Sequence, residues 1–264
     1  MRKALRSLMS SLIAAIRTQD APRVLYYHRI DEDNHRSSVY PKLFLLQLEH
    51  LAHHKYQVLT LADLYRTLEQ RQSLPRRSVV LTFDDGFADN YRYAYPALRQ
   101  FGFPATIFLT VGFIGSDTLP VLSDTRRALP PLNWEQVHEM HGHGVEFGSH
   151  TLTHPSLPQL TQEAAKQEVF ASRVLLQEKL GHTVSFFCYP RGALTPAVKE
   201  IVRQAGYSGA CSTFPGPVRR ESDRYALPRT YISHDDTVQD FRKKLCGAYD
   251  WLHAGVQLWR QVRS

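Results

Sequence analysis

Residues 78–86 read Ser-Val-Val-Leu-Thr-Phe-Asp-Asp-Gly, a run typical of a buried strand that leads directly into two carboxylates and a glycine. Adjacent residues of a strand point to opposite faces, so Asp84 and Asp85 can share one site only if the strand ends and turns there. Gly86 permits such a turn. Two carboxylates this close repel each other, and a cation or a solvated loop must offset the repulsion. An ordinary strand end with an Asp-Gly turn would read the same, so the motif alone leaves both interpretations open.

Strand-like runs alternate with helical patterns along the chain. Thr60 and Thr195 stand where helices should begin, and Gly102, Gly181 and Gly206 stand where helices should end. We expect strands at residues 23–27, 78–83, 105–110, 145–148, 184–189 and 208–210, and helices at 41–54, 61–71, 90–101, 134–141, 162–180 and 196–205.

This alternation predicts an α/β fold, in which helices surround a parallel sheet. At this length we favour a distorted (β/α) barrel over an open doubly wound sheet, although the pattern itself fits both. We expect a single domain at residues 21–264, preceded by an amphipathic helix at 1–20. In either architecture the chemistry should lie at the C-terminal ends of the strands.

The composition is that of an ordinary globular protein. Of 264 residues, 43% are apolar and 22% are charged, which is enough to bury a full core. Cys188, Cys211 and Cys246 are too few and too widely spaced for a disulfide framework or a CxxC metal site, and they fit a reducing compartment. The net charge of +7 suggests an anionic partner. No nucleic-acid-binding motif is present, so we do not expect nucleic acid to be that partner.

Both ends of the chain carry basic amphipathic patterns. Segment 1–20 places arginines beside an apolar helical stripe, and segment 250–263 combines Trp251 and Trp259 with arginines. Such peripheral helices either lie at an anionic membrane surface or cover the barrel, and the sequence leaves both open. No convincing signal peptide is present, so we expect a cytoplasmic protein, free or peripheral at the membrane. The stripe of the first segment consists of Leu5, Leu8, Met9, Leu12, Ile13 and Ile16.

A second motif, Glu-Phe-Gly-Ser-His-Thr-Leu-Thr-His-Pro at residues 146–155, ends another expected strand in two histidines. Its threonines and Pro155 argue against a long helix, so we expect one turn or a loop. Two imidazoles and a carboxylate can hold a transition metal and leave positions open for water and substrate. Taken alone, the pair His150 and His154 is weak evidence, because the chain has 13 histidines.

The two motifs together are more specific than either one, and in combination they resemble the polysaccharide deacetylases of carbohydrate esterase family 4. The family's first motif looks like residues 82–86 and its second like residues 150–154. The resemblance extends over about residues 22–245. Further similar segments are residues 26–29, 134, 144–148, 187–192 and 205–207.

The resemblance implies hydrolysis of an N-acetyl or other N-acyl amide on an amino sugar of a polysaccharide or glycolipid. Asp85, His150 and His154 would bind one divalent metal, usually zinc. Asp84 would be the general base, held ionised by the nearby positive charge. The implied partner is an N-acetylated glycan or a lipid-linked sugar.

The family's third motif looks like residues 189–192, and here the chain departs from the pattern. In the family this motif supplies a backbone N–H to the oxyanion and an aromatic wall, which implies a catalytic role for Arg191 and substrate contacts for Tyr189 and Pro190. Arg191 stands where a tyrosine is usual, so it keeps the N–H and adds a guanidinium suited to a phosphate or carboxylate. Cys188 replaces the arginine that positions the base. Arg229, which we place among the substrate-binding residues, is also the candidate to replace that arginine.

The general acid has two candidates. His234 is one, but the family's late histidine motif has no clean match around it. His28 follows the first expected strand, and family members with an early Tyr-His segment use that histidine as the acid. We favour His28.

Two other functions use the same residues. Two histidines and a carboxylate also form the metal site of Fe(II) oxygenases, although those enzymes usually have a different fold. The altered third motif also fits a catalytically lapsed, glycan-binding member of the same family. The sequence does not identify the sugar.

Overall fold

The computed structural model describes residues 21–33, 35–118 and 129–250. The helices expected at residues 1–20 and from 251 onward lie outside the described residues. Within the described ranges, no helix combines the length and the hydrophobicity needed to cross a bilayer.

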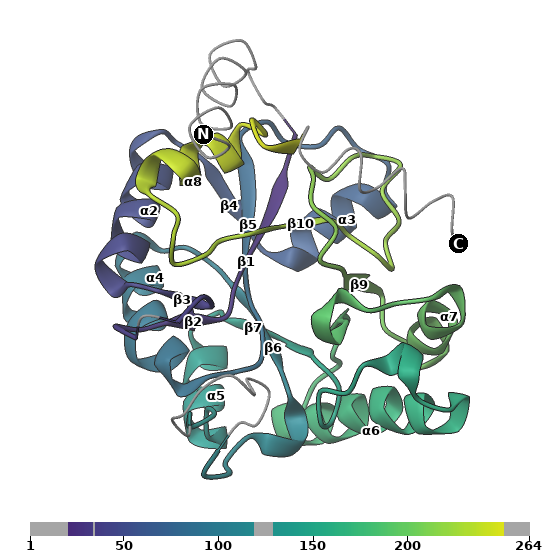
Figure 1. Ribbon diagram of the computed structural model, residues 1–264. Helices are drawn as coiled ribbons and strands as arrows, with labels where there is room; N and C mark the ends of the chain where they lie inside the picture. The colour runs from purple at the N-terminus through teal and green to yellow at the C-terminus, as the bar shows by residue number, and fades with distance from the viewer. Residues whose placement is uncertain (1–20, 34, 119–128, 251–264) are drawn as a thin grey trace, which may run out of the picture.

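The centre of the molecule is a parallel sheet that curves into a nearly closed barrel (Figure 1). The strand order is β10-β1-β5-β6-β7-β8-β9, and β4 pairs with the start of β5. A bridge between Cys211 and Leu227 brings β9 beside the segment that leads into β10. The barrel prediction is therefore confirmed. The strands are β1 (Arg23–Tyr27), β4 (Gln57–Leu59), β5 (Ser78–Phe83), β6 (Thr106–Leu109), β7 (Glu146–Ser149), β8 (Phe186–Cys188), β9 (Gly209–Cys211) and β10 (Arg229–Tyr231).

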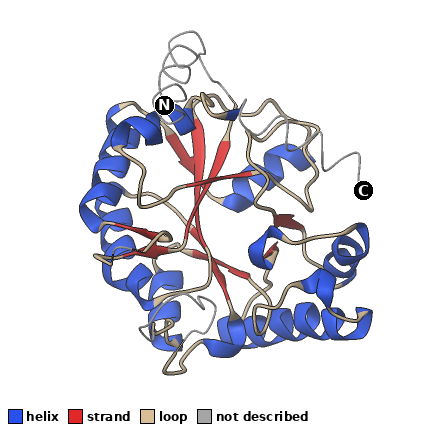
Figure 2. Cartoon of the chain, in the orientation of Figure 1, coloured by secondary structure: helices blue, strands red, loops and turns tan. Residues whose placement is uncertain are grey.

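Helices surround these strands (Figure 2). Thr60, Thr161 and Thr195 each cap a helix by accepting a backbone N–H, and Gly102 and Gly181 end helices in the left-handed conformation. The α-helices are α2 (Pro41–His53), α3 (Leu61–Glu69), α4 (Tyr95–Phe101), α5 (Trp134–Gly142), α6 (Gln162–Leu180), α7 (Pro196–Gln204) and α8 (Val238–Leu245). A π-helical turn, η1 (Asn90–Ala94), precedes α4, and short 3₁₀ turns are η2 (Val111–Phe113), η3 (Leu157–Gln159) and η4 (Pro190–Gly192).

The sequence did not reveal the shortest elements. β4, β10 and the small sheet of β2 (Arg29–Ile30) and β3 (Ser38–Val39) have two or three residues each, too few to show a period. The helix expected at residues 90–101 is divided, because its first turn is the π-helical η1. α8 was also missed.

Alternation along the strands separates the two largest clusters of the core. Val24, Val80 and Phe108 belong to a cluster that includes side chains of α3, whereas Leu25 and Leu81 pack with the other helices. Thr82 comes two residues after Val80, and Asp84 comes four residues after it. The three side chains therefore point to the same face, and the strand directs Asp84 toward the first of these clusters. This places a carboxylate inside the mouth of the barrel.

Glu146 begins β7 with a carboxylate that accepts a hydrogen bond from the Thr106 hydroxyl at 2.7 Å. Burial raises the pKa of Glu146 from 4.5 to about 7. Between these pH values the folded chain retains a proton that the unfolded chain releases, so stability falls as the pH rises through this window.

We expect Glu146→Gln, which cannot ionise, to gain about 3 kcal/mol of stability relative to the wild type between pH 4 and pH 8. Chemical unfolding at several pH values measures this, with exposed Glu178→Gln as control. Parallel pH profiles of the wild type and Glu146→Gln would contradict the assignment.

Candidate metal and catalytic site

The expected site residues gather where the strands end. Asp84 and Asp85 follow β5, His150 follows β7, and Tyr189 follows β8. The Asp84 N–H donates to the Tyr27 carbonyl at the end of β1, and the His150 N–H donates to the Leu109 carbonyl at the end of β6. Four neighbouring parallel strands thus fix the backbone of the first two motifs.

Residues in the left-handed conformation set the directions of the site side chains. Asp85 has φ 77°, so the strand direction ends immediately after Asp84 and the two carboxylates need not point to opposite faces. Thr151 and His154 have φ 70° and 64°, and the His154 N–H donates to the Thr151 hydroxyl at 2.9 Å. The second motif is therefore a tight loop rather than a long helix, as predicted from its threonines and proline.

Asp85, His150 and His154 face one another in a geometry that fits a metal ion. The Asp85 Oδ1 lies 3.6 Å from His150 Nε2 and 3.5 Å from His154 Nε2, and one ligand atom from each residue lies within 4.8 Å of the others. Asp85 Oδ1 is buried and has no hydrogen-bond partner among the described residues. A buried, unpartnered carboxylate oxygen is costly, and a bound cation would offset that cost.

The protonation states also suit a metal site. His150 Nδ1 lies 2.7 Å from the Cys188 carbonyl, so it carries the proton and leaves Nε2 free to ligate. Burial lowers the pKa of His154 to about 2, which keeps its imidazole neutral. Burial, and then the adjacent Asp84 charge, raise the pKa of Asp85 well above its usual range. A divalent cation would stabilise the ionised form of Asp85.

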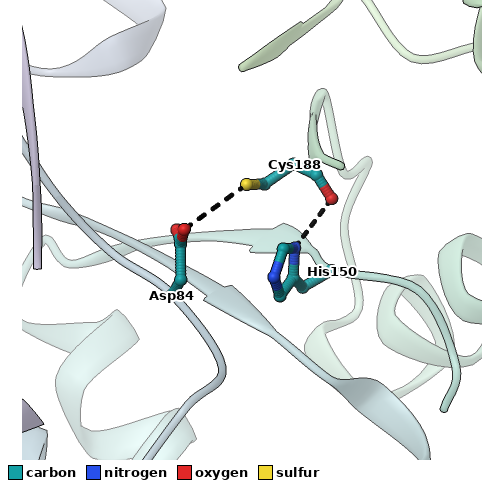
Figure 3. Close-up of side chains that lie close together, drawn as sticks. All are labelled: Asp84, His150 and Cys188. Atoms are coloured by element: carbon teal, nitrogen blue, oxygen red, sulfur yellow. Dashed lines mark hydrogen bonds between the residues drawn. The ribbon is translucent and has the colours of Figure 1, made fainter. Parts of the chain in front are cut away.

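A second group, Asp84, His150 and Cys188, is also close enough to hold a metal (Figure 3). Here the Cys188 thiol points to Asp84 and its carbonyl points to His150. Burial raises the pKa of Cys188 well above its usual range, so the thiol stays protonated. The Arg229 guanidinium lies 3.0 Å from Cys188 Sγ and would repel a cation there. The Asp85 set is therefore the better ligand group.

Arg229 is the partner of Asp84. Its Nη1 and Nη2 each donate to one oxygen of Asp84 at 2.7 Å, and its Nε donates to the Ser212 carbonyl. Burial raises the pKa of Asp84, but the Arg229 charge and hydrogen bonds outweigh it and hold that pKa well below the usual range. The guanidinium is fully buried, so Arg229 is the partner of Asp84 and not, as expected, also a substrate-binding residue.

His28 lies beside this pair. The charges of Asp84, Arg229 and His150 all act on it, and burial lowers its pKa to about 4. Its Nδ1 is buried without a hydrogen-bond partner among the described residues. Two edge-on aromatic contacts, with Tyr26 and Tyr231, flank the ring.

Asn90 and Asp89 hold the backbone around His28, and no motif in the sequence pointed to them. Asn90 Nδ2 donates to the His28 carbonyl at 2.9 Å, and Asp89 Oδ1 accepts the Ile30 N–H at 3.0 Å. They come four to six residues after Asp84 and Asp85, across the turn that ends β5. His28 is thus positioned through its backbone.

His234, the other candidate acid, has a different environment. Its Nε2 lies 3.2 Å from the exposed Asp235 carboxylate. The charge of His28, by contrast, acts on the pKa values of both Asp84 and His154. The geometry favours His28.

The third motif is arranged differently from expectation. Tyr189 is fully buried and donates its hydroxyl to the Tyr225 carbonyl, so its ring belongs to the core and is not exposed to substrate. Pro190 is also buried. Arg191 is exposed in the left-handed conformation, φ 59°, and its charge helps lower the pKa of His154. Among these residues, Arg191 alone offers its side chain to a ligand.

The chain belongs to the polysaccharide deacetylase family, whose model matches residues 71–210. Members of this family are hydrolases that act on amide bonds.

Several known proteins are similar. YxkH of Bacillus subtilis (strain 168), which carries a polysaccharide deacetylase name, is 31% identical over 210 residues, covering 80% of this chain and 71% of that protein. The poly-beta-1,6-N-acetyl-D-glucosamine N-deacetylase of Staphylococcus aureus (strain MSSA476) is 24% identical over 238 residues, covering 86% and 78%. The structure of Streptococcus pyogenes deacetylase PplD, solved with acetate, aligns with a TM-score of 0.75 at 25% identity, covering 86% of this chain and 99% of that chain.

We expect the purified protein to carry about one equivalent of divalent metal, or to take it up from zinc solution, and His150→Ala to lose it because one ligand is gone. Elemental analysis measures this, with exposed His138→Ala as the matched control. Less than about a tenth of an equivalent, with no uptake on zinc titration, would contradict the metal site.

Proposed function

We propose that this protein removes N-acetyl groups from the amino sugars of a glycan, using a divalent metal, most simply zinc. The observation that carries the proposal is the juxtaposition of two carboxylates with different tasks. Asp85 faces two neutral imidazoles and suits a metal, whereas Asp84 is held ionised by Arg229. A base is more useful beside the metal than on it.

The proposed ligands are Asp85, His150 and His154. When bound, the metal would lower the pKa of water and polarise the acyl carbonyl. Asp84 takes a proton from the attacking water, and Arg229 keeps both carboxylate oxygens in place during that transfer. The Arg191 backbone N–H is the proposed donor to the oxyanion.

His28 is the proposed acid that protonates the leaving amine. Since its pKa is lowered to about 4, it enters the reaction as a neutral imidazole and must gain a proton before it can donate one. The negative charge of Asp84 raises the pKa of His28 and so favours the charged form. The proton removed from water can therefore pass from Asp84 toward the amine through His28.

The substrate class follows from the relatives and from Arg191. The Staphylococcus aureus relative is named for poly-beta-1,6-N-acetyl-D-glucosamine, and we propose an N-acetylated hexosamine polymer or lipid-linked sugar for this chain. The exposed Arg191 guanidinium suits a substrate that also carries a phosphate or carboxylate. The arrangement of Asp84, Asp85 and both histidines argues against a lapsed, purely glycan-binding protein, and the family membership argues against an oxygenase.

We expect acetate release from at least one of a panel of N-acetylated glycans and lipid-linked sugars. Asp84→Asn should keep its metal and lower the turnover rate about 10²–10⁴-fold, because it cannot accept the proton. Acetate release and metal content measure the two effects. Near-native turnover in Asp84→Asn would contradict the assignment of Asp84 as the general base.

We expect His28→Ala to lower the turnover rate more than His234→Ala, since only His28 lies beside Asp84. Asn90→Asp, which keeps the size but loses the donor to the His28 carbonyl, should lower turnover in the wild type and add little in the His28→Ala background. Steady-state kinetics of folded, metal-loaded variants measure this. The opposite ranking of the two histidines would transfer the acid role to His234.

A further inference from the structure

Seven described residues other than glycine have a clearly positive φ, and they fall into two groups. Asp85, Thr151, His154 and Arg191 surround the site. The other three are basic: Lys55, Arg71 and Arg77, with φ of 54°, 52° and 48°. The left-handed conformation is unfavourable for side chains with a Cβ, and glycine would adopt it without that cost. Lys55 and Arg71 are the left-handed residues that end α2 and α3, since the N–H groups of Tyr56 and Gln72 donate to the Leu51 and Thr67 carbonyls. Glycine is usual at such positions, so in this group a basic side chain stands where glycine would fit.

The three basic residues lie at the end of the barrel opposite the site. Each is in a loop that leads from a helix into a strand: Lys55 between α2 and β4, Arg71 between α3 and β5, and Arg77 directly before β5. The Arg77 carbonyl accepts the N–H of Gln57, the first residue of β4. All three side chains are exposed. We call this end the basic face.

More positive charge surrounds them. Arg77 and Arg242 of α8 both act on the pKa of Tyr56, which burial raises and these guanidiniums lower. They also act on the exposed His54, whose pKa is lowered first by desolvation and then by His53, Arg242 and Arg77. Within the described part of the chain, no ion pair engages Lys55, Arg71, Arg77 or Arg242. The nearby carboxylates Glu69 and Asp250 are already paired, with Arg224 and Arg23.

Both ends of the described chain meet at the basic face. Residue 21 leads directly into β1, and Asp250 pairs with Arg23, the first residue of β1, at 2.6 Å. The adjoining sequences on both sides combine basic and large apolar residues. A soluble anion needs only the charges, whereas a bilayer with anionic headgroups uses both kinds of side chain. These residues are Arg2, Lys3, Leu5, Arg6, Leu8, Leu12, Trp251, Trp259, Arg260 and Arg263.

We propose that the basic face docks this protein on an anionic lipid bilayer. Lys55, Arg71, Arg77 and Arg242 contact the headgroups. The left-handed backbone of Lys55, Arg71 and Arg77 lowers stability relative to glycine, and we attribute this loss to the need for positive charge at these positions. The inference does not rest on the catalytic proposal, because the basic face shares no residue with the site. It gives the docked enzyme a definite orientation, with the site opening away from the bilayer.

The test compares the wild type with a triple variant, Lys55→Gly, Arg71→Gly and Arg77→Gly, in flotation with phosphatidylglycerol vesicles and with phosphatidylcholine vesicles. We expect wild-type binding to the anionic vesicles only, weakened by salt. The triple variant should bind more than about tenfold more weakly. Its Tm should be equal or higher, since glycine relieves the backbone strain, and turnover on a soluble substrate should be unchanged.

A charge-matched control removes three positive charges near the site end of the barrel: Lys42→Gln, Arg92→Gln and Lys166→Gln, which lie within the first five residues of α2, η1 and α6. It should bind vesicles like the wild type. If both triple variants lost vesicle binding to the same extent, net charge alone would explain the effect and the proposal would be overturned. Binding of the wild type to soluble polyphosphate but not to anionic vesicles would overturn it in favour of an anionic polymer.

Discussion

The pair formed by Arg229 and Asp84 connects the fold to the chemistry. Arg229 belongs to the last strand of the barrel and Asp84 follows β5, and two hydrogen bonds of 2.7 Å join them across β1. The same guanidinium donates to the Thr82 hydroxyl and the Ser212 carbonyl and lies 4.4 Å from the centre of the Tyr26 ring. A buried charge is stable only when it is paired and fully hydrogen-bonded, so neither side chain could keep its place without the other.

Cys188 makes room for this arrangement. A thiol is small and, at the pKa imposed by its burial, uncharged, so it can lie against both Arg229 and Asp84 without adding a third charge. The family pattern has an arginine at this place on β8, whereas here the arginine comes from β10. In this chain the guanidinium beside Asp84 is therefore supplied from a different strand.

The elements and residues that could be predicted from the sequence are those marked by long apolar runs, helix caps or recognisable motifs. β1, β5 and α6 have the expected bounds because their apolar runs and caps are complete. Asp85, His150 and His154 were expected together because their motifs follow two parallel strands, and β5 and β7 lie on either side of β6. β4 and β10 were missed because three residues show no periodicity, and β10 begins with a buried arginine that reads as a surface residue. Asn90 was missed because it acts through a hydrogen bond to a backbone carbonyl. Tyr189 was misplaced because a motif does not tell which of its side chains faces the core.

The closure of the barrel between its first and last strands has a consequence for the order of events during synthesis. Asp84, Asp85, His150 and His154 all emerge from the ribosome well before Arg229, and contacts between distant parts of a chain form late. A nascent chain can thus assemble its two motifs while Asp84 still lacks its counter-charge. Only when β10 pairs with β1, at Val24 with Arg229, does the buried carboxylate gain its partner. Assembly of the proposed site is in this way coupled to synthesis of β10, and a chain that stopped before Arg229 would lack the partner of Asp84.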